Sequence, residues 1–205
     1  LIENVLDFSR IDQGRKQFEF EPTDVRALVR QTVRLMEPQA TERQVTLTFD
    51  FHDDDGGPQT TDHETTDHGT TSSHPQPSLD GRAIQQALVN LIDNAIKHAP
   101  PKSTIEVGLA FDPPAPEAAR LPSSNPTDHT SPFRIWVHDS GDGIPAAEHE
   151  KIFESFYRRG TELRRETTGI GIGLTIVRHI VAAHGGRVTV ESEPGHGSKF
   201  TLHIP

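Results

Sequence analysis

The stretch GRAIQQALVNLIDNAIKHA, from Gly81 to Ala99, decides how the rest of the chain must be arranged. Its apolar side chains recur every three or four residues, and this spacing predicts one long amphipathic helix with a buried face. Pro100 and Pro101 follow directly and end the helix, because proline lacks the backbone N–H that a helix uses. A helix with one apolar face requires a second layer to pack against. That face consists of Ile84, Ala87, Leu88, Leu91, Ile92, Ala95 and Ile96.

A second, polar stripe runs along the same helix. Gln86, Asn90, Asn94 and Lys97 are spaced four, four and three residues apart, so they share one side of it. One interpretation is a solvated face. The other is a metal–phosphate site, because an asparagine carbonyl oxygen is a hard neutral ligand suited to Mg²⁺. The stripe alone leaves both interpretations open.

The second layer is predicted to be a sheet. Apolar and polar residues alternate, as in half-buried strands, over 45–51, 105–111, 133–137, 187–191 and 199–204. Phe18 and Phe20 alternate in the same way and suggest a further short strand. Helices are predicted over Leu1–Gln13 and, behind a cap at Thr23, along Val25–Met36. We therefore expect an α+β fold, a two-layer sandwich in which helices cover one face of a mixed, mainly antiparallel sheet.

Composition narrows the possible functions. The chain has 205 residues and a net charge of −10, which argues against a general nucleic-acid-binding protein. It has no cysteine, so disulfides and thiolate metal sites are excluded. It contains no apolar run long enough to span a bilayer. The chain begins with leucine inside a helical pattern, so we expect it to be a fragment of a longer protein.

Two polar tracts, 52–78 and 112–132, interrupt the periodic elements. They lack apolar periodicity, and we expect both to be disordered inserts within one domain, because regular elements resume on either side. The first tract contains four histidines that could bind a metal or simply be solvated. Their irregular spacing favours the solvated loop. These histidines are His52, His63, His68 and His74.

The segment HDSGDGIP, from His138 to Pro145, follows the strand predicted over 133–137. That strand delivers Asp139 to its end, where a carboxylate can accept a hydrogen bond from an exocyclic amine such as that of adenine. Gly141 and Gly143 let the backbone turn or approach a flat ligand closely. Taken alone, the segment favours the alternative, an ordinary Asp-Gly-rich turn.

A glycine-rich run, GIGIGLTIVRHIVAAHGG, spans Gly169 to Gly186 and leads into another helix. Unpaired N–H groups and the dipole at a helix N-terminus attract phosphate, and glycines keep side chains out of the way. The run is not a dinucleotide-binding loop, because no strand leads into it. It is not a Walker A loop either, because no Gly-Lys-Ser/Thr follows.

Between these two glycine segments lies EKIFESFYRRG, from Glu150 to Gly160. Its aromatic residues Phe153, Phe156 and Tyr157 stand beside Arg158. Two interpretations remain open: an amphipathic helix packed on the core, or a lid whose aromatic anchors bring arginine to the phosphates of a nucleotide.

Taken in order, these segments resemble the sensor histidine kinases of two-component systems, within the Bergerat-type (GHKL) ATPase superfamily. NLIDNAIKH is similar to the family's asparagine box, DSGDGIP to the first glycine box, FESFYR to the phenylalanine box and TTGIGIGL to the second glycine box. GHGSKFTLHIP resembles the closing hairpin. LIENVLDFSRIDQG resembles the end of the second helix of the dimerisation and phosphoacceptor domain.

The resemblance implies a Bergerat ATP-binding fold and two domain pieces. Residues 1–16 would be the end of the dimerisation domain, and residues 17–205 the catalytic domain with the two inserts. Asn94 would ligate Mg²⁺ with Asn90 in support, Asp139 would take the adenine amino group, and Lys97 would contact phosphate. The remaining residues implied to hold Mg²⁺-ATP are His98, Gly141, Gly143, Ile144, Tyr157, Arg158, Gly169, Gly171, Gly173 and Leu174.

One position separates the subclasses of this superfamily. Members that hydrolyse ATP carry a glutamate one turn before the Mg²⁺ asparagine, and here that position is Asn90. An amide cannot act as a general base, which favours phosphoryl transfer to a protein side chain over ATP hydrolysis. The alternatives are an ATP-hydrolysing member of the same fold and a non-catalytic nucleotide-binding module.

The family's acceptor histidine lies on the first helix of the dimerisation domain, and we expect it to be absent from this chain. HETT, at His63–Thr66, matches an acceptor box only superficially, because it lies in a polar tract and not on a helix. The resemblance further implies a dimerisation domain and a response regulator receiver domain as partners, a homodimeric whole protein and no nucleic acid. It implies a cytoplasmic, bacterial domain and allows an anchor in the inner membrane.

Overall fold

The computed structural model describes residues 8–11, 13, 15–52, 76–112, 132–157 and 171–205. A five-stranded sheet has the order β2-β4-β5-β7-β6. Its parallel pair, β2 with β4, is followed by three antiparallel pairs, as expected for a mixed, mainly antiparallel sheet. The strands are β2 (Thr46–His52), β4 (Thr104–Phe111), β5 (Phe133–Asp139), β6 (Arg187–Ser192) and β7 (Ser198–Ile204).

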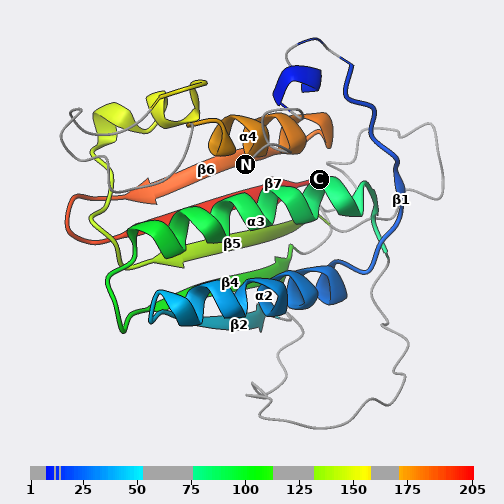
Figure 1. The fold of residues 1–205 in the computed structure, drawn as a ribbon. Helices are drawn as coiled ribbons and strands as arrows, with labels where there is room; N and C mark the ends of the chain where they lie inside the picture. Colours follow the sequence, from blue (N-terminus) through cyan, green and yellow to red (C-terminus); the bar gives the residue numbers. More distant parts are fainter. Residues whose placement is uncertain (1–7, 12, 14, 53–75, 113–131, 158–170) are drawn as a thin grey trace, which may run out of the picture.

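Three long helices in the described part of the chain lie side by side over one face of this sheet (Figure 1). They are α2 (Val25–Glu42), α3 (Gly81–His98) and α4 (Gly173–Ala183). The helix α3 lies in the middle and contacts both neighbours, and it also forms part of the crossover between the parallel strands β2 and β4. The predicted two-layer fold is confirmed. No described helix combines the length and the apolar character that crossing a membrane requires.

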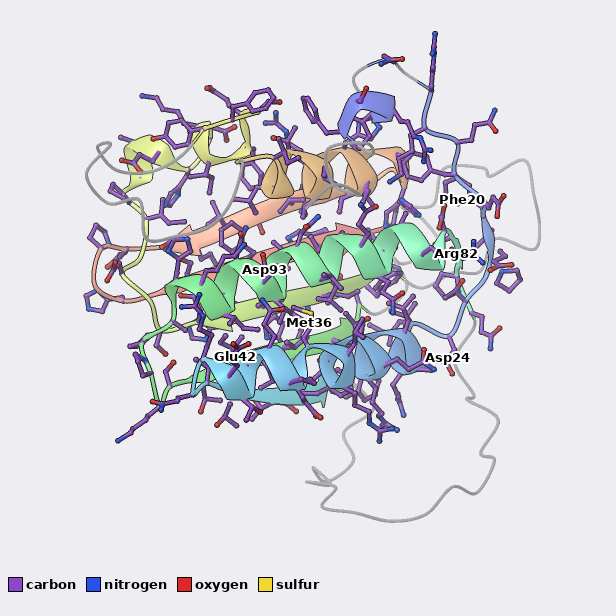
Figure 2. The ribbon with its side chains drawn as sticks, viewed as in Figure 1. Phe20, Asp24, Met36, Glu42, Arg82 and Asp93 are labelled. Carbon is purple, nitrogen blue, oxygen red and sulfur yellow. The ribbon has the colours of Figure 1, made fainter. Side chains whose placement is uncertain are left out.

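The core lies between α3 and the central strands. Leu88 and Ile92 of α3, and Ile135 and Leu202 of the sheet, have no exposed side-chain surface. Burying an aliphatic side chain of this size stabilises the folded state by about 1.5–3 kcal/mol. Figure 2 shows Met36 in the space between α2 and α3, where it extends the same core to the edge of the layer. The apolar face of α3 therefore packs against β5 and between the other two long helices.

The predicted cap of α2 is wrong by one residue. The cap is Asp24, whose side chain accepts a hydrogen bond from the Ala27 N–H at 2.9 Å. The hydroxyl of Thr23 instead donates to the Glu21 carbonyl at 2.9 Å. Both residue types cap helices well, so the sequence pattern could not choose between two adjacent candidates.

The short strand expected at Phe18 and Phe20 is also wrong. The strand in this region is β1 (Glu21–Pro22), which pairs antiparallel with β3 (Ser78–Leu79). The two phenylalanine rings contact His184 at the end of α4, with centroids 5.7 and 5.0 Å from its ring. Their alternation therefore reflects packing on α4 and not strand pairing.

Both predicted inserts begin and end in ordered residues. His52 ends β2 and Ser78 begins β3, so the first insert is shorter than predicted, and residues 53–75 lie outside the described residues. At the second insert, the Asp112 N–H donates to the Pro132 carbonyl at 2.7 Å and closes the pair β4–β5, while residues 113–131 lie outside the described residues.

The N-terminal segment is helical at residues 8–11, as predicted for the end of a helix. Its Phe8 ring meets the Phe156 ring edge-on at 5.5 Å. Lys16 donates to the Gln86 side chain on α3 at 2.9 Å. The described part of residues 1–16 therefore packs against the larger unit, and a domain boundary at residue 16 stays a prediction.

Candidate functional site

The N-terminus of α4 differs from those of the other two long helices that the structure describes. Asp24 caps α2 and Asp80 caps α3 through side-chain hydrogen bonds, whereas the Ile172 cap of α4 makes none. The first N–H groups of a helix need partners, and together with the helix dipole they attract anions. The glycine-rich run thus leads into a helix end that lacks a side-chain cap.

Asn90 lies directly beside that helix end. The position a Cβ would take on Gly173 is 3.7 Å from the Asn90 Oδ1 atom. Asn90 is buried at 7% exposure, and Asn94 is half-buried one helical turn further along α3. The two carboxamides therefore follow the side of α3 that faces the N-terminus of α4.

The other two members of the predicted polar stripe have partners elsewhere. Lys97 forms an ion pair with Asp93, which also accepts a hydrogen bond from Gln39 of α2 at 2.7 Å (Figure 2 shows Asp93 on α3). Gln86 accepts from Lys16. Lys97 is thus drawn toward α2, and its predicted contact with phosphate stays a prediction.

Asp139 ends β5 and is only 5% exposed. Burial raises the pKa of its carboxyl above the ordinary value of 3.8; a backbone hydrogen bond from Gly141, the charges of His98 and His138, and a backbone hydrogen bond at Ser198 oppose the rise. The Gly141 N–H donates to Oδ1 at 2.7 Å. A buried carboxylate with a raised pKa at a strand end is typical of a binding site, where it can accept a further hydrogen bond from a ligand.

The loop after Asp139 touches the C-terminal end of α3. A Cβ on Gly141 would lie 2.6 Å from the His98 carbonyl oxygen, so only glycine permits this approach. The His98 side chain itself is exposed. Along α3, Asn90, Asn94 and His98 cover about 12 Å at 1.5 Å per residue, which places the amides and the Asp139 loop along one edge of the helix.

The hairpin between β6 and β7 holds this loop in place, a feature that sequence reasoning missed. The Ile144 N–H donates to the Ser192 hydroxyl at 2.7 Å, and the Gly195 N–H donates to the Asp142 carbonyl at 2.8 Å. Gly143 backs onto the Glu193 main chain. The alternation of 187–191 and 199–204 pointed to two strands but not to what their turn would contact.

The segment before the glycine-rich run is anchored to the start of α4. Gly171 has φ +78°, and its carbonyl accepts from the Phe156 N–H at 2.9 Å, while a Cβ there would lie 2.7 Å from the Tyr157 carbonyl oxygen. A side chain at this position would be strained on both counts. Tyr157 and Leu174 are half-buried beside this junction, whereas Arg158 and Gly169 lie outside the described residues.

The amphipathic-helix interpretation of 150–160 is not what the described residues show. They form a single 3₁₀ turn, η3 (Lys151–Phe153), after η2 (Ala146–Glu148). Phe153 is buried against the Phe200 ring, and its carbonyl accepts from the Thr175 hydroxyl at 3.0 Å. Phe153 thus anchors this segment to α4 and the sheet, whereas Phe156 is 61% exposed.

A metal cage of side-chain carboxylates and imidazoles is absent from the part of the chain that the structure describes, because no three such residues gather there. His52 lies on β2, and His63, His68 and His74 lie outside the described residues. A metal at this site would depend on amide oxygens and on its ligand's own phosphates.

Comparison with known proteins shows which family shares this sequence and fold. A family model described as histidine kinase-, DNA gyrase B- and HSP90-like ATPase matches residues 79–205. The circadian input-output histidine kinase CikA of Synechococcus elongatus is 26% identical over 100% of the chain, which covers 23% of CikA. The adaptive-response sensory kinase SasA of Synechocystis is 27% identical over 100% of the chain, which covers 44% of SasA. The chain thus spans less than half the length of either relative.

Among solved structures, full-length ShkA in complex with AMPPNP matches with a TM-score of 0.68 and 26% sequence identity. The match covers 100% of this chain and 35% of ShkA. The arrangement of three helices on one face of a mixed sheet is therefore shared with a protein that was crystallised with an ATP analogue.

Proposed function

Because the chain belongs to the histidine kinase-, DNA gyrase B- and HSP90-like ATPases and carries the ATP-binding domain of a sensor histidine kinase, we propose that it transfers the γ-phosphoryl group of Mg²⁺-ATP to a histidine. The acceptor would lie on a separate dimerisation domain. The observation that carries this proposal is that two features lie along one edge of α3. The N-terminus of α4, which has no side-chain cap, lies beside Asn90, and the buried carboxylate of Asp139 lies toward the other end of that edge.

The base end of the site would be formed by Asp139 and its loop. A buried carboxylate acceptor suits the amino group of adenine, whereas the oxo group of guanine would face a second acceptor. Ile144, which is half-buried, and His98 would flank the base. The close approach of Gly141 to α3 holds the Asp139 loop against the end of the helix.

The phosphate end would use the start of α4 and the asparagines of α3. The main-chain N–H groups that follow Gly171 and Gly173 would donate to phosphate oxygens. The carbonyl oxygen of Asn94 would ligate Mg²⁺, which prefers oxygen ligands and retains waters and phosphate oxygens around it. The metal would neutralise charge on the phosphates while the chain positions them.

Asn90 supports transfer over hydrolysis. It lies beside the phosphate end, where a hydrolytic enzyme needs a base to activate water, and an amide cannot take up a proton at neutral pH. In the transfer step, a bond forms between phosphorus and an imidazole nitrogen while the bond to the bridging oxygen of ADP breaks. A response regulator receiver domain would then accept the phosphoryl group, and the whole protein would act as a homodimer.

The test incubates the 205-residue chain with γ-labelled ATP, Mg²⁺ and a protein that carries the dimerisation domain. We expect an acid-labile label on that domain's histidine and little free phosphate from the chain alone. Asn94→Ala should weaken ATP binding roughly tenfold or more when Mg²⁺ is present and change it little in EDTA.

Arg82→Ala is the matched control, because Arg82 is exposed at the opposite end of α3 (Figure 2). Rapid release of free phosphate by the chain alone, with no labelled histidine, would support the hydrolytic alternative. Unchanged affinity for Mg²⁺-ATP in Asn94→Ala would remove the metal role of that residue.

A further inference from the structure

A row of polar side chains crosses three adjacent strands at the end of the sheet. Asp139 of β5 is paired with Ser198 of β7, and Ser198 is paired with Ser192 of β6. Residues paired directly across neighbouring strands lie on the same face with their Cβ atoms about 5 Å apart. Two residues further into the sheet, the equivalent row is apolar: Val137, Phe200 and Val190. The helix-covered face therefore changes from core to polar at this row.

Ser192 lies at the centre of three hydrogen bonds. Its oxygen accepts from the Ile144 N–H at 2.7 Å, lies 2.7 Å from the Gly197 carbonyl oxygen and lies 3.0 Å from the Ser198 hydroxyl oxygen. A carbonyl can only accept, and a serine has one hydroxyl hydrogen. The hydrogen of Ser192 is therefore directed to Gly197, and Ser198 supplies the hydrogen of the bond between the two serines.

This order of hydrogen bonds fixes what Ser198 offers to a ligand. Because its hydrogen is directed to Ser192, only the oxygen lone pairs of Ser198 remain, next to the carboxylate of Asp139. Ser198 is buried at 6% exposure, so bulk water does not readily exchange this arrangement. The end of the row nearest Asp139 thus presents two acceptors and no side-chain donor.

We propose that Ser192 determines the base specificity of the nucleotide site, because it orients the Ser198 hydroxyl and keeps this edge an acceptor only. A 6-amino purine has two hydrogens on its 6-nitrogen to donate to such an edge, whereas the 6-oxygen of a 6-oxo purine offers only lone pairs at that position and is repelled. The inference rests on the proposed nucleotide-binding function and adds a specificity-determining residue that does not itself touch the base.

The experiment measures the affinities of the 205-residue chain for Mg²⁺-ATP and Mg²⁺-inosine triphosphate by calorimetry. These nucleotides differ at the 6-position and in the proton on the adjacent ring nitrogen. In Ser192→Ala, Ser198 can turn its hydrogen toward the base, so we expect the preference for ATP to fall by roughly three- to tenfold, the range that corresponds to one neutral hydrogen bond. A loosened loop at Ile144 would weaken both nucleotides equally and leave their ratio unchanged.

Three further variants make the test specific. Thr189→Val removes a hydroxyl from the same strand but from the opposite face of the sheet, where it bonds His203, and should keep the wild-type ratio. Ser192→Thr keeps the hydroxyl and should also keep the wild-type ratio of the two affinities. In a Ser198→Ala background, Ser192→Ala should cause no further change in the ratio, because its effect acts through Ser198.

An unchanged ratio in Ser192→Ala, or an equal change in the presence and absence of Ser198, would overturn the inference while leaving nucleotide binding intact. If the wild-type chain bound neither nucleotide, the proposed function itself would fail, and the inference with it.

Discussion

Asp139 is a carboxylate in a position that disfavours its charge. Burial raises its pKa above 3.8, and the hydrogen bond from Gly141 only partly opposes this effect. At pH values above the raised pKa, the folded state holds a buried negative charge that the unfolded chain exposes to water. The free energy of unfolding therefore loses a contribution as the pH rises from about 3.8 through the folded-state pKa. A residue kept against stability in this way is expected at a binding site.

Asp139→Asn should therefore raise the melting temperature of the nucleotide-free chain at neutral pH and reduce the fall of stability with rising pH. The same change should weaken ATP binding by about ten- to a hundredfold, because it removes a charged acceptor. Thermal melts between pH 4 and 8, with and without Mg²⁺-ATP, measure both effects. If nucleotide-free Asp139→Asn were less stable than wild type at every pH, the buried charge of Asp139 would not be its dominant effect on the free energy of unfolding.

At the scale of elements, the two ends of α3 have different tasks. Its N-terminus is held by Asp80, whose carboxylate accepts from the Ala83 N–H at 2.9 Å and from the Glu19 N–H at 3.1 Å. Its C-terminus lies against the Asp139 loop. The capped end therefore stabilises the fold, and the other end belongs to the candidate site.

Asp80→Ala should lower the free energy of unfolding by about 1–2 kcal/mol, because it removes the helix cap. Asp80→Asn is the matched control: its carbonyl oxygen can still cap α3, but its amide nitrogen cannot accept from Glu19. The free energies of unfolding of the two variants, measured in urea, differ by the contribution of the helix cap, and Asp80→Asn alone reports the contribution of the bond from Glu19. Equal stability of Asp80→Ala and wild type would contradict the cap assignment.

At the scale of the whole molecule, His184 joins three segments that are distant in the sequence. Its Nδ1 lies 2.7 Å from the Ile180 carbonyl oxygen, so that nitrogen carries the hydrogen, and its Nε2 accepts from the Asp80 N–H at 3.0 Å. The rings of Phe18 and Phe20 cover it (Figure 2 shows Phe20 near the start of α3). The C-terminus of α4, the N-terminus of α3 and the N-terminal segment therefore meet at one buried imidazole.

His184→Ala should lower the free energy of unfolding by about 2–4 kcal/mol, because it leaves a cavity and removes a partner from a backbone N–H. His196→Ala, in the exposed β6–β7 turn, is the control and should change stability little. Urea unfolding of the whole chain measures both. Wild-type stability in His184→Ala would show that the three segments hold together without it.

How much the sequence predicted depends on the range of the interaction. The face of α3 and the strand at Phe133 were predicted correctly, because each residue's burial follows from its own neighbours in the chain. The cap at Asp24 was missed, because Thr23 and Asp24 are equivalent in pattern. The ion pair of Lys97 with Asp93 follows from their spacing of four residues on one helix, whereas only the fold shows that Gln39 of α2 also bonds Asp93.

The sequence by itself determined the two layers of this protein, since helical and strand periodicities are properties of local segments and state which face each segment must bury. It also identified the glycines and the asparagines whose chemistry suits a nucleotide. Only the tertiary structure decided which polar groups meet: Asn90 beside Gly173, His184 beside Asp80, and Ser192 in register with Ser198 and Asp139. These contacts join segments many residues apart, so they depend on strand register and helix packing, which local periodicity does not encode.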